Sequence, residues 1–208
     1  MPEWKNLSVE TKNGMLQIPE DELKSMPTEM LVQAYIDNPF CSLIFVYNTV
    51  QDGFNRVYDE FSGLRELVRR DDAALEIVSF YKNMQVDGYD RNWESNKIGK
   101  FTFKFIYVEA LLSQSEIISQ LNQNETKMLT NELLKKYNDK IKHVSEHSIV
   151  GLESSAYAIA HILYQNGKLS QPGKKLDDAT NIFLETGRIP RNDILDNIIQ
   201  KAELFIQN

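Results

Sequence analysis

Residues 98–112 read Ile98-Gly-Lys-Phe-Thr-Phe-Lys-Phe-Ile-Tyr-Val-Glu-Ala-Leu-Leu112, and this stretch decides the fold class. Its middle part, Phe101 to Phe105, alternates between apolar and polar residues as a strand does. The apolar positions 98, 101, 105, 108 and 112, however, recur at alternating spacings of three and four, which is the period of an amphipathic helix. Because that register continues to Leu112, the stretch predicts a helix that is buried along one seam.

The same helical period recurs along most of the chain, and no hairpin signal accompanies it. Further seams comprise Met30, Leu31, Ala34 and Tyr35; Phe54, Val57, Tyr58 and Phe61; Met128, Leu133, Leu134, Tyr137, Ile141 and Val144; Leu152, Ala156, Ile159 and Leu163; and Leu195, Ile198, Ile199, Ala202 and Phe205. Neighbouring seams are buried by packing against each other. We therefore predict an all-α fold, a single-domain irregular bundle of about nine helical segments.

The length of 208 residues suits one domain with one core. Residues 1–18 are polar and without periodicity, which predicts an irregular N-terminal arm. Residues 19–208 then form a single all-helical domain. The longest polar stretch inside it, residues 85–97, predicts a loop and is the candidate sub-domain boundary.

Composition excludes several classes of function. The net charge is −7 and the basic residues are scattered, so we expect no nucleic-acid binding, which depends on clustered Lys and Arg. The single cysteine, Cys41, rules out both an intrachain disulfide and a CxxC metal site. No apolar run is long enough for a transmembrane helix, and no targeting signal is visible, although the sequence leaves open whether a leader peptide was removed.

The segment Phe61-Ser-Gly-Leu-Arg-Glu-Leu-Val-Arg-Arg-Asp-Asp-Ala73 concentrates charges between two helical seams. Glu66 and Arg70 stand at i, i+4 in the order that favours an ion pair. Arg69 and Arg70 lie near the end of one helix, and Asp71 lies at the start of the next, where each charge suits the helix dipole. We interpret these residues as a structural corner between two helices.

This corner also carries a resemblance, together with Ile18-Pro-Glu-Asp-Glu-Leu-Lys-Ser-Met-Pro-Thr-Glu-Met-Leu31, Asp37-Asn-Pro39 and Asn48-Thr-Val-Gln-Asp-Gly-Phe54. The four segments are similar to those of a group of all-helical bacterial proteins without an established activity. That group shows Tyr-Pro in place of Asn38-Pro39, and Phe-Asn-Gly in place of Phe61-Ser-Gly63. Its members often carry an export or lipoprotein leader, so the resemblance implies a secreted or membrane-anchored, cell-envelope protein. It covers roughly the first eighty residues and transfers no functional residue.

His143-Val-Ser-Glu-His147 matches the H-x-x-E-H pattern of some zinc peptidases. In such a pattern His143 and His147 share one Zn²⁺ and Glu146 is the general base. The phase of the helix argues against a site here, because Ile141 and Val144 continue the predicted buried seam. That phase places His143 on the polar face and His147 on its flank. We expect no metal and no cofactor, and the motif supports only an alternative hypothesis.

The predicted loop 85–97 contains Tyr89, Arg91 and Trp93. Aromatic residues on a loop either attach it to the body of the protein or contact a ligand. Attachment is the preferred interpretation. If these residues are exposed, they form the patch where a protein or glycan partner would bind.

We therefore predict a non-catalytic helical interaction or structural module associated with the cell envelope. Two alternatives stay open: a metal-dependent hydrolase that uses the H-x-x-E-H motif, and an intracellular acidic adaptor or inhibitor. The sequence indicates neither the identity of the partner nor the oligomeric state.

Overall fold

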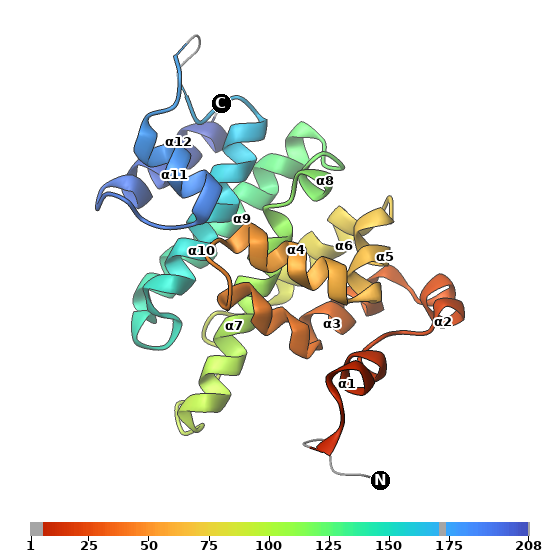
Figure 1. Cartoon of the computed structure of the whole chain (residues 1–208). Helices are drawn as coiled ribbons and strands as arrows, with labels where there is room; N and C mark the ends of the chain where they lie inside the picture. Colours follow the sequence, from red (N-terminus) through yellow and green to blue (C-terminus); the bar gives the residue numbers. More distant parts are fainter. Residues whose placement is uncertain (1–5, 171–173, 208) are drawn as a thin grey trace.

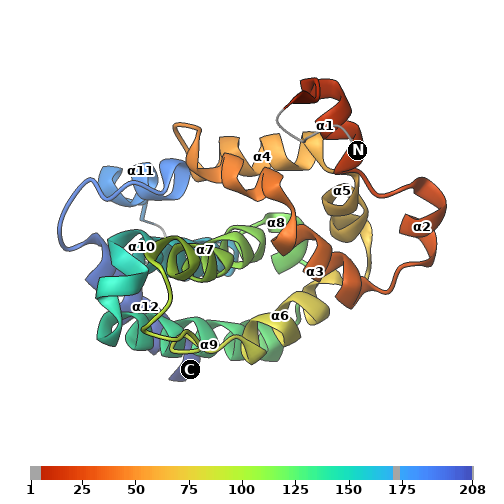
Figure 2. The same cartoon turned by 90° about the horizontal axis from the view of Figure 1, so that it is seen from below.

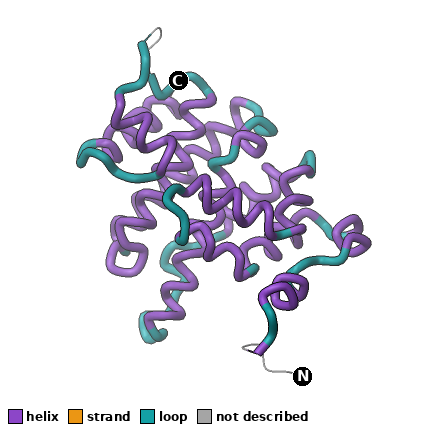
Figure 3. The backbone as a smooth tube through the Cα atoms, viewed as in Figure 1, coloured by secondary structure: helices purple, strands orange, loops and turns teal. Residues whose placement is uncertain are grey.

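The computed structural model describes residues 6–170 and 174–207, which form helices and loops without a strand (Figure 3). The all-α prediction is confirmed, but these residues contain twelve α-helices where the sequence predicts about nine. The helices are α1 (Val9–Met15), α2 (Glu20–Ser25), α3 (Thr28–Asp37), the 3₁₀-helix η2 (Pro39–Phe45), α4 (Val50–Glu60), α5 (Ser62–Arg69), α6 (Ala73–Asn83), α7 (Ser95–Leu112), α8 (Ser115–Ile118), α9 (Gln123–Lys142), α10 (Val144–Gln165), α11 (Asp178–Thr186) and α12 (Ile194–Gln207).

Short helices account for the difference, and one of them lies in the predicted arm. The prediction of an irregular arm is wrong for its described part, because α1 begins behind Ser8, whose hydroxyl accepts a hydrogen bond from the Thr11 amide. The Gln17 side chain then donates to the Glu60 carbonyl at 2.6 Å, which attaches this segment to the end of α4. Residues 1–5 of the arm lie outside the described residues.

Helix α7 lies at the centre of the molecule, with α3, α4, α6, α9 and α10 around it (Figure 2). At its C-terminal end residues 108–112 are all buried, and Phe105, Leu111 and Leu112 have no exposed surface. Burying an apolar side chain of this size contributes about 1.5–3 kcal/mol. The N-terminal half extends away from the body of the protein (Figure 1), so its side chains have a free face. The predicted seam is thus correct, but burial of the C-terminal half is more complete than one seam implies.

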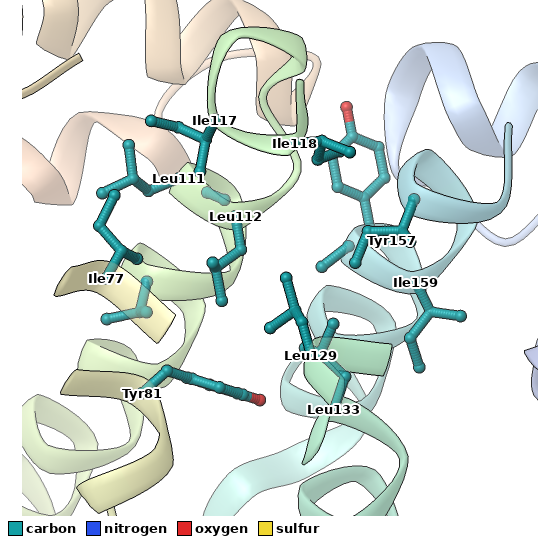
Figure 4. Packing of buried hydrophobic residues seen from close by; sticks show 14 of the residues in the cluster. Ile77, Tyr81, Leu111, Leu112, Ile117, Ile118, Leu129, Leu133, Tyr157 and Ile159 are labelled. Carbon is teal, nitrogen blue, oxygen red and sulfur yellow. The ribbon is translucent and has the colours of Figure 1, made fainter. Parts of the chain in front are cut away.

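The buried apolar side chains of α3 to α12 form one continuous cluster. Figure 4 shows its middle, where Ile77 and Tyr81 of α6, Leu111 and Leu112 of α7 and Leu129 and Leu133 of α9 gather close to Ile117, Ile118, Tyr157 and Ile159. The loop between α6 and α7 contributes Val86 to the same cluster. Residues before and after this loop therefore share one core.

Several helix ends carry the capping residues that the sequence offers. The Thr49 hydroxyl accepts from the Asp52 amide at the start of α4. Asn122 and Glu125 form a capping box at the start of α9. Gly187 ends α11 with φ 73°, a left-handed conformation that glycine adopts without strain.

The junction of α9 and α10 differs from the predicted continuous seam. Helix α9 ends at Lys142, and Ser148 interrupts α10 with φ 56° and ψ 177°. Each break rotates the helical register. Val144, predicted to face inward, follows the first break and is about half exposed, and His147 is buried in its place. Ile141 precedes both breaks and is also about half exposed, because the buried face of α9 runs through Leu133, Tyr137 and Lys140. Met128, also predicted to face inward, is exposed.

Candidate functional site

The two histidines of the H-x-x-E-H motif lie at the start of α10 and make separate contacts. The Tyr89 hydroxyl lies 2.9 Å from Nδ1 of His143. Nε2 of His147 lies 2.9 Å from the carbonyl of Val86, and because a carbonyl only accepts, this nitrogen carries the proton. Burial lowers the pKa of His147, so its neutral form is favoured. Both imidazoles thus hold the α6–α7 loop.

Among the residues that the structure describes, no group of three or more His, Cys, Asp or Glu side chains could hold a metal ion. Glu146, the third residue of the motif, accepts a hydrogen bond from the Ser145 hydroxyl at 2.6 Å. The contacts of His143 and His147 with Tyr89 and Val86 favour a structural role for the motif. The hydrolase hypothesis stays a prediction without a supporting contact.

The loop aromatics attach the loop to the body of the protein. Tyr89 is only 9% exposed, and its ring centroid lies 5.8 Å from that of Phe101 on α7. The Trp93 ring also contacts Phe101, at 6.2 Å, and the ammonium of Lys97 lies 3.9 Å from its centroid. Of the predicted partner patch, Arg91 is exposed, Trp93 is partly buried and Tyr89 is buried. Tyr89 is therefore not available at the surface to a protein or glycan partner.

A buried ion pair, which the sequence analysis missed, lies close to this loop. The ammonium of Lys140 on α9 contacts both carboxylate oxygens of Glu109 on α7, at 2.7 and 2.8 Å, and neither side chain has exposed surface. Lys140 also donates to the carbonyl of Gly151 and the hydroxyl of Ser155. The hydroxyl of Tyr81 on α6 donates to Glu109 at 2.6 Å. These contacts join four helices, α6, α7, α9 and α10, through one charged pair.

Ser154 and Ser155 of α10 complete the hydrogen bonds to the Glu109 carboxylate. A buried charge is costly unless it is paired and hydrogen-bonded, and this pair satisfies both conditions. Burial lowers the pKa of Lys140 and raises that of Tyr81 well above its usual value. A signal for the pair is present in the sequence: Glu109 stands alone in the apolar stretch Phe105–Leu112, and Lys140 falls in phase with Leu133 and Tyr137.

The charged corner of the sequence is a structural junction. Glu66 and Arg70 form a 2.7 Å ion pair, and Arg70 also donates to the carbonyl of Leu23 at 2.8 Å. The N-cap position of α6 is Asp72 rather than the predicted Asp71, because a turn after Arg70 shifts the start of the helix. The Asp72 carboxylate accepts from Thr28 on α3 instead of capping α6.

The corner's other arginines have different surroundings. Arg65 donates to the carbonyls of Tyr58 and Asp59 at the end of α4. These hydrogen bonds give Arg65 a structural role that does not require a ligand. Arg69 is exposed at the end of α5. The corner therefore connects α2, α3, α5 and α6, and its geometry shows no chemistry beyond that.

An exposed aromatic surface lies where η2 meets α7. Phe45 at the end of η2 and Phe103 on α7 have ring centroids 4.7 Å apart, and Tyr107 lies 5.9 Å from Phe45. We call these three residues the aromatic face. Phe45 and Phe103 are 39% and 41% exposed, a large fraction for two phenylalanines in contact. Val46 and Tyr47, which follow η2 in the chain, are 72% and 43% exposed.

A groove of about 610 Å³ adjoins the aromatic face. It is lined by Pro39 and Ser42 of η2 and by Lys100, Phe103, Lys104 and Tyr107 of α7, among others. Lys104 forms a 2.7 Å ion pair with Asp37. Burial alone would raise the pKa of Asp37, but hydrogen bonds from Lys104 and Gln33 lower it below its usual value. Lys100, at the same groove, is exposed and has no carboxylate partner among the described residues.

The sequence does indicate the aromatic face, but the strand-like alternation of residues 101–105 obscures that indication. Phe103 falls outside the seam of Phe101 and Phe105 and is followed by Lys104. In a helix, an aromatic residue outside the seam points away from the core. Residues 101–105, whose alternation resembles that of a strand, therefore belong to a helix with two apolar faces, one buried and one exposed.

Comparison of the chain with protein-family models, curated proteins and solved structures finds no match. The resemblance of the first eighty or so residues to all-helical bacterial proteins therefore stays a prediction. None of the helices in the described part of the chain has the length and apolar character to cross a bilayer.

Proposed function

We propose that the chain is a non-catalytic helical binding module and that its aromatic face, with the adjoining groove, holds an acidic, apolar segment of a partner protein. The observation that carries this proposal is the contact of two exposed phenylalanines, Phe45 and Phe103, beside a groove lined by two lysines. A few residues carry most of the binding energy of a protein interface, and aromatic residues are enriched in interface cores.

The form of the groove supports a segment of protein as its occupant. It runs between η2 and α7, and its walls are apolar at Phe103, Tyr107 and Pro39. A short helix or an extended peptide places apolar anchors in such a groove and leaves its polar side chains at the rim. A protein partner is favoured over a glycan because the rim offers charged groups rather than a set of neutral hydrogen-bonding groups.

The charge at the rim indicates the kind of segment. Lys100, Lys104 and Asp37 line the groove, and since Asp37 pairs with Lys104, Lys100 leaves the groove with a net positive charge in a chain whose net charge is −7. A partner with Asp or Glu flanking its apolar anchors would complement this local charge, which favours rapid encounter and correct orientation. The resemblance of the N-terminal segments adds the expectation that the partner is met at the cell envelope.

Selection from a displayed random-peptide library on the immobilised chain tests this function. We expect the selected peptides to combine aromatic or leucine residues with Asp and Glu. Phe103→Ser should weaken their binding by about 2 kcal/mol, or roughly thirtyfold, because it removes a central anchor. Met128→Ser is the matched control, since Met128 is 60% exposed on α9, and it should leave binding unchanged.

Exchange of charge provides a second test of the same surface. The double variant Lys100→Glu, Lys104→Glu should disfavour acidic peptides. The peptide binding that remains should no longer depend on the salt concentration. Failure to select any peptide would contradict the proposal. So would selection of peptides that bind the Phe103→Ser variant as well as the original chain, or peptides that are basic.

A further inference from the structure

A second cleft, separate from the aromatic face, lies between α4, the α7–α8 turn and α10. Its volume is about 380 Å³. Gln51, Asn55 and Tyr58 come from α4, Gln114 and Glu116 from the turn and the start of α8, and His161 from α10. Three segments that are distant in sequence therefore bring polar groups to one concave site, which is the form of a small-molecule site.

His161 lines this cleft, and its contacts hold the imidazole ring in a fixed position. Its Nε2 lies 3.1 Å from the carbonyl of Leu184, so Nε2 carries the proton and donates. The ring is also held against Tyr157, with centroids 4.4 Å apart. Burial lowers the pKa of His161, which favours the neutral imidazole. Nδ1 then has a lone pair, and no described residue donates a hydrogen bond to it.

The amides in the cleft are already oriented by one another. Gln51 donates from Nε2 to the side-chain oxygens of both Asn55 and Gln114, at 2.9 and 3.0 Å. Gln114 is 5% exposed and donates in turn to the carbonyl of Ala110 at 2.7 Å. This chain of hydrogen bonds holds the side chains of the cleft wall in place. A ligand would therefore bind a preformed surface, and its binding would not have to order these side chains.

The charge of the cleft selects for a cation. Glu116 is exposed, it accepts a hydrogen bond from the Ser115 hydroxyl at 2.8 Å, and no cation pairs with it among the described residues. No Lys or Arg lines the cleft, so the charged side chain that an anion would meet there is the repelling carboxylate of Glu116. Phe54, Tyr58 and Val68 provide apolar surface, and an aromatic ring such as that of Tyr58 also attracts cations.

We propose that this cleft binds a small organic cation, a protonated amine with an apolar body. Its N–H groups donate to the Glu116 carboxylate and to Nδ1 of His161, and its apolar body lies against Phe54, Tyr58 and Val68. This site is independent of the aromatic face and does not depend on the function proposed for that face.

Three probes of similar shape but different charge test the proposal: phenethylamine, 2-phenylethanol and phenylacetate. Binding is followed by NMR of the imidazole signals of the three histidines in the intact chain. We expect phenethylamine to shift the His161 signals in a saturable way at millimolar concentration. The neutral probe should bind at least fivefold more weakly, and phenylacetate should not bind.

Two variants separate this site from a general attraction of amines to an acidic protein. Glu116→Gln removes the exposed charge with little change in shape and should weaken phenethylamine binding about tenfold without changing that of 2-phenylethanol. Glu203→Gln on the exposed side of α12 is the matched control and should have no effect. Equal binding of the three probes would overturn the proposal. So would an unchanged affinity in Glu116→Gln, or His161 signals that do not respond to phenethylamine.

Discussion

Replacement of Lys140 by methionine tests the buried ion pair at the centre of the fold. Lys140 contacts two carboxylate oxygens of Glu109, the carbonyl of Gly151 and the hydroxyl of Ser155, all within 3.0 Å. Methionine matches the length of the lysine stem but cannot donate to any of these groups. The Glu109 carboxylate then stays in the core without a counter-charge.

The expected cost follows from the burial of both groups. Removal of one partner from a fully buried pair costs about 3–5 kcal/mol, since the remaining charge is uncompensated. Glu109 keeps the hydroxyl donors of Tyr81, Ser154 and Ser155, so we expect a value near the lower end of this range. With a urea dependence of about 2 kcal/mol per molar, the unfolding midpoint should fall by about 1.5 M.

A double-mutant cycle in urea, followed by circular dichroism, measures the effect. Glu109→Gln in the Lys140→Met background removes the uncompensated charge and should restore part of the lost stability. Lys24→Met is the control, because Lys24 pairs with Glu20 on an exposed surface and its loss should not shift the midpoint. Our reasoning would be refuted if Lys140→Met behaved like Lys24→Met, or if the effects of the two core substitutions were additive.

Three further predictions concern pH and the backbone. Burial lowers the pKa of both His147 and His161, so the unfolded chain binds more protons below its own histidine pKa of about 6.5. The contribution of the neutral histidines to the free energy of unfolding should therefore be fully present above that pH. It should fall by up to about 1.4 kcal/mol per pH unit per histidine as the pH decreases toward the pKa values of the folded chain. Urea midpoints that stay constant from pH 7.5 to 5.5 would contradict this. Gly187→Ala should cost about 2 kcal/mol in urea unfolding, since Gly187 has φ 73° and an added Cβ would lie 2.7 Å from Cγ2 of Val50; an unchanged midpoint would show that this turn relaxes. Ser148→Gly should raise the melting temperature by a few degrees, because the φ of 56° and ψ of 177° strain any residue other than glycine; a lower melting temperature would mean that the serine itself stabilises the kink.

Local patterns in the sequence predict much of the fold. The spacing from Ile98 to Leu112 identifies α7, and Thr49 and Gly187, residue types that favour helix ends, lie at the start of α4 and the end of α11. These features depend on residues within a few positions of each other, so they can be recognised without tertiary information.

The junction of α9 and α10 could not be predicted from such patterns. No glycine or proline interrupts residues 141–150, and the strained conformation falls on an ordinary serine, Ser148. The helix also breaks at His143, and beyond this break His147 is buried and Val144 is exposed. Tertiary contacts, here those of His147 with Val86 and Phe105, decide a break that the local sequence does not specify.

The contacts of the buried ion pair and of the cleft could not be predicted for a related reason. Glu109 stands out in its apolar stretch, but Tyr81, Glu109, Lys140 and Ser155 lie on four different helices, and no local pattern indicates that they meet. Their juxtaposition exists only after the helices pack. The same holds for His161 in the cleft, which the sequence shows only as one polar residue between two apolar neighbours.

Hydrogen exchange of the chain with and without a selected acidic peptide tests the central claim, which is that the aromatic face holds the partner. We expect slower exchange in residues 39–47 and 100–107, the segments that form the aromatic face and its groove. The Phe103→Ser variant should lose this protection. Protection confined to other segments, such as the α6–α7 loop or the cleft at His161, would contradict the claim.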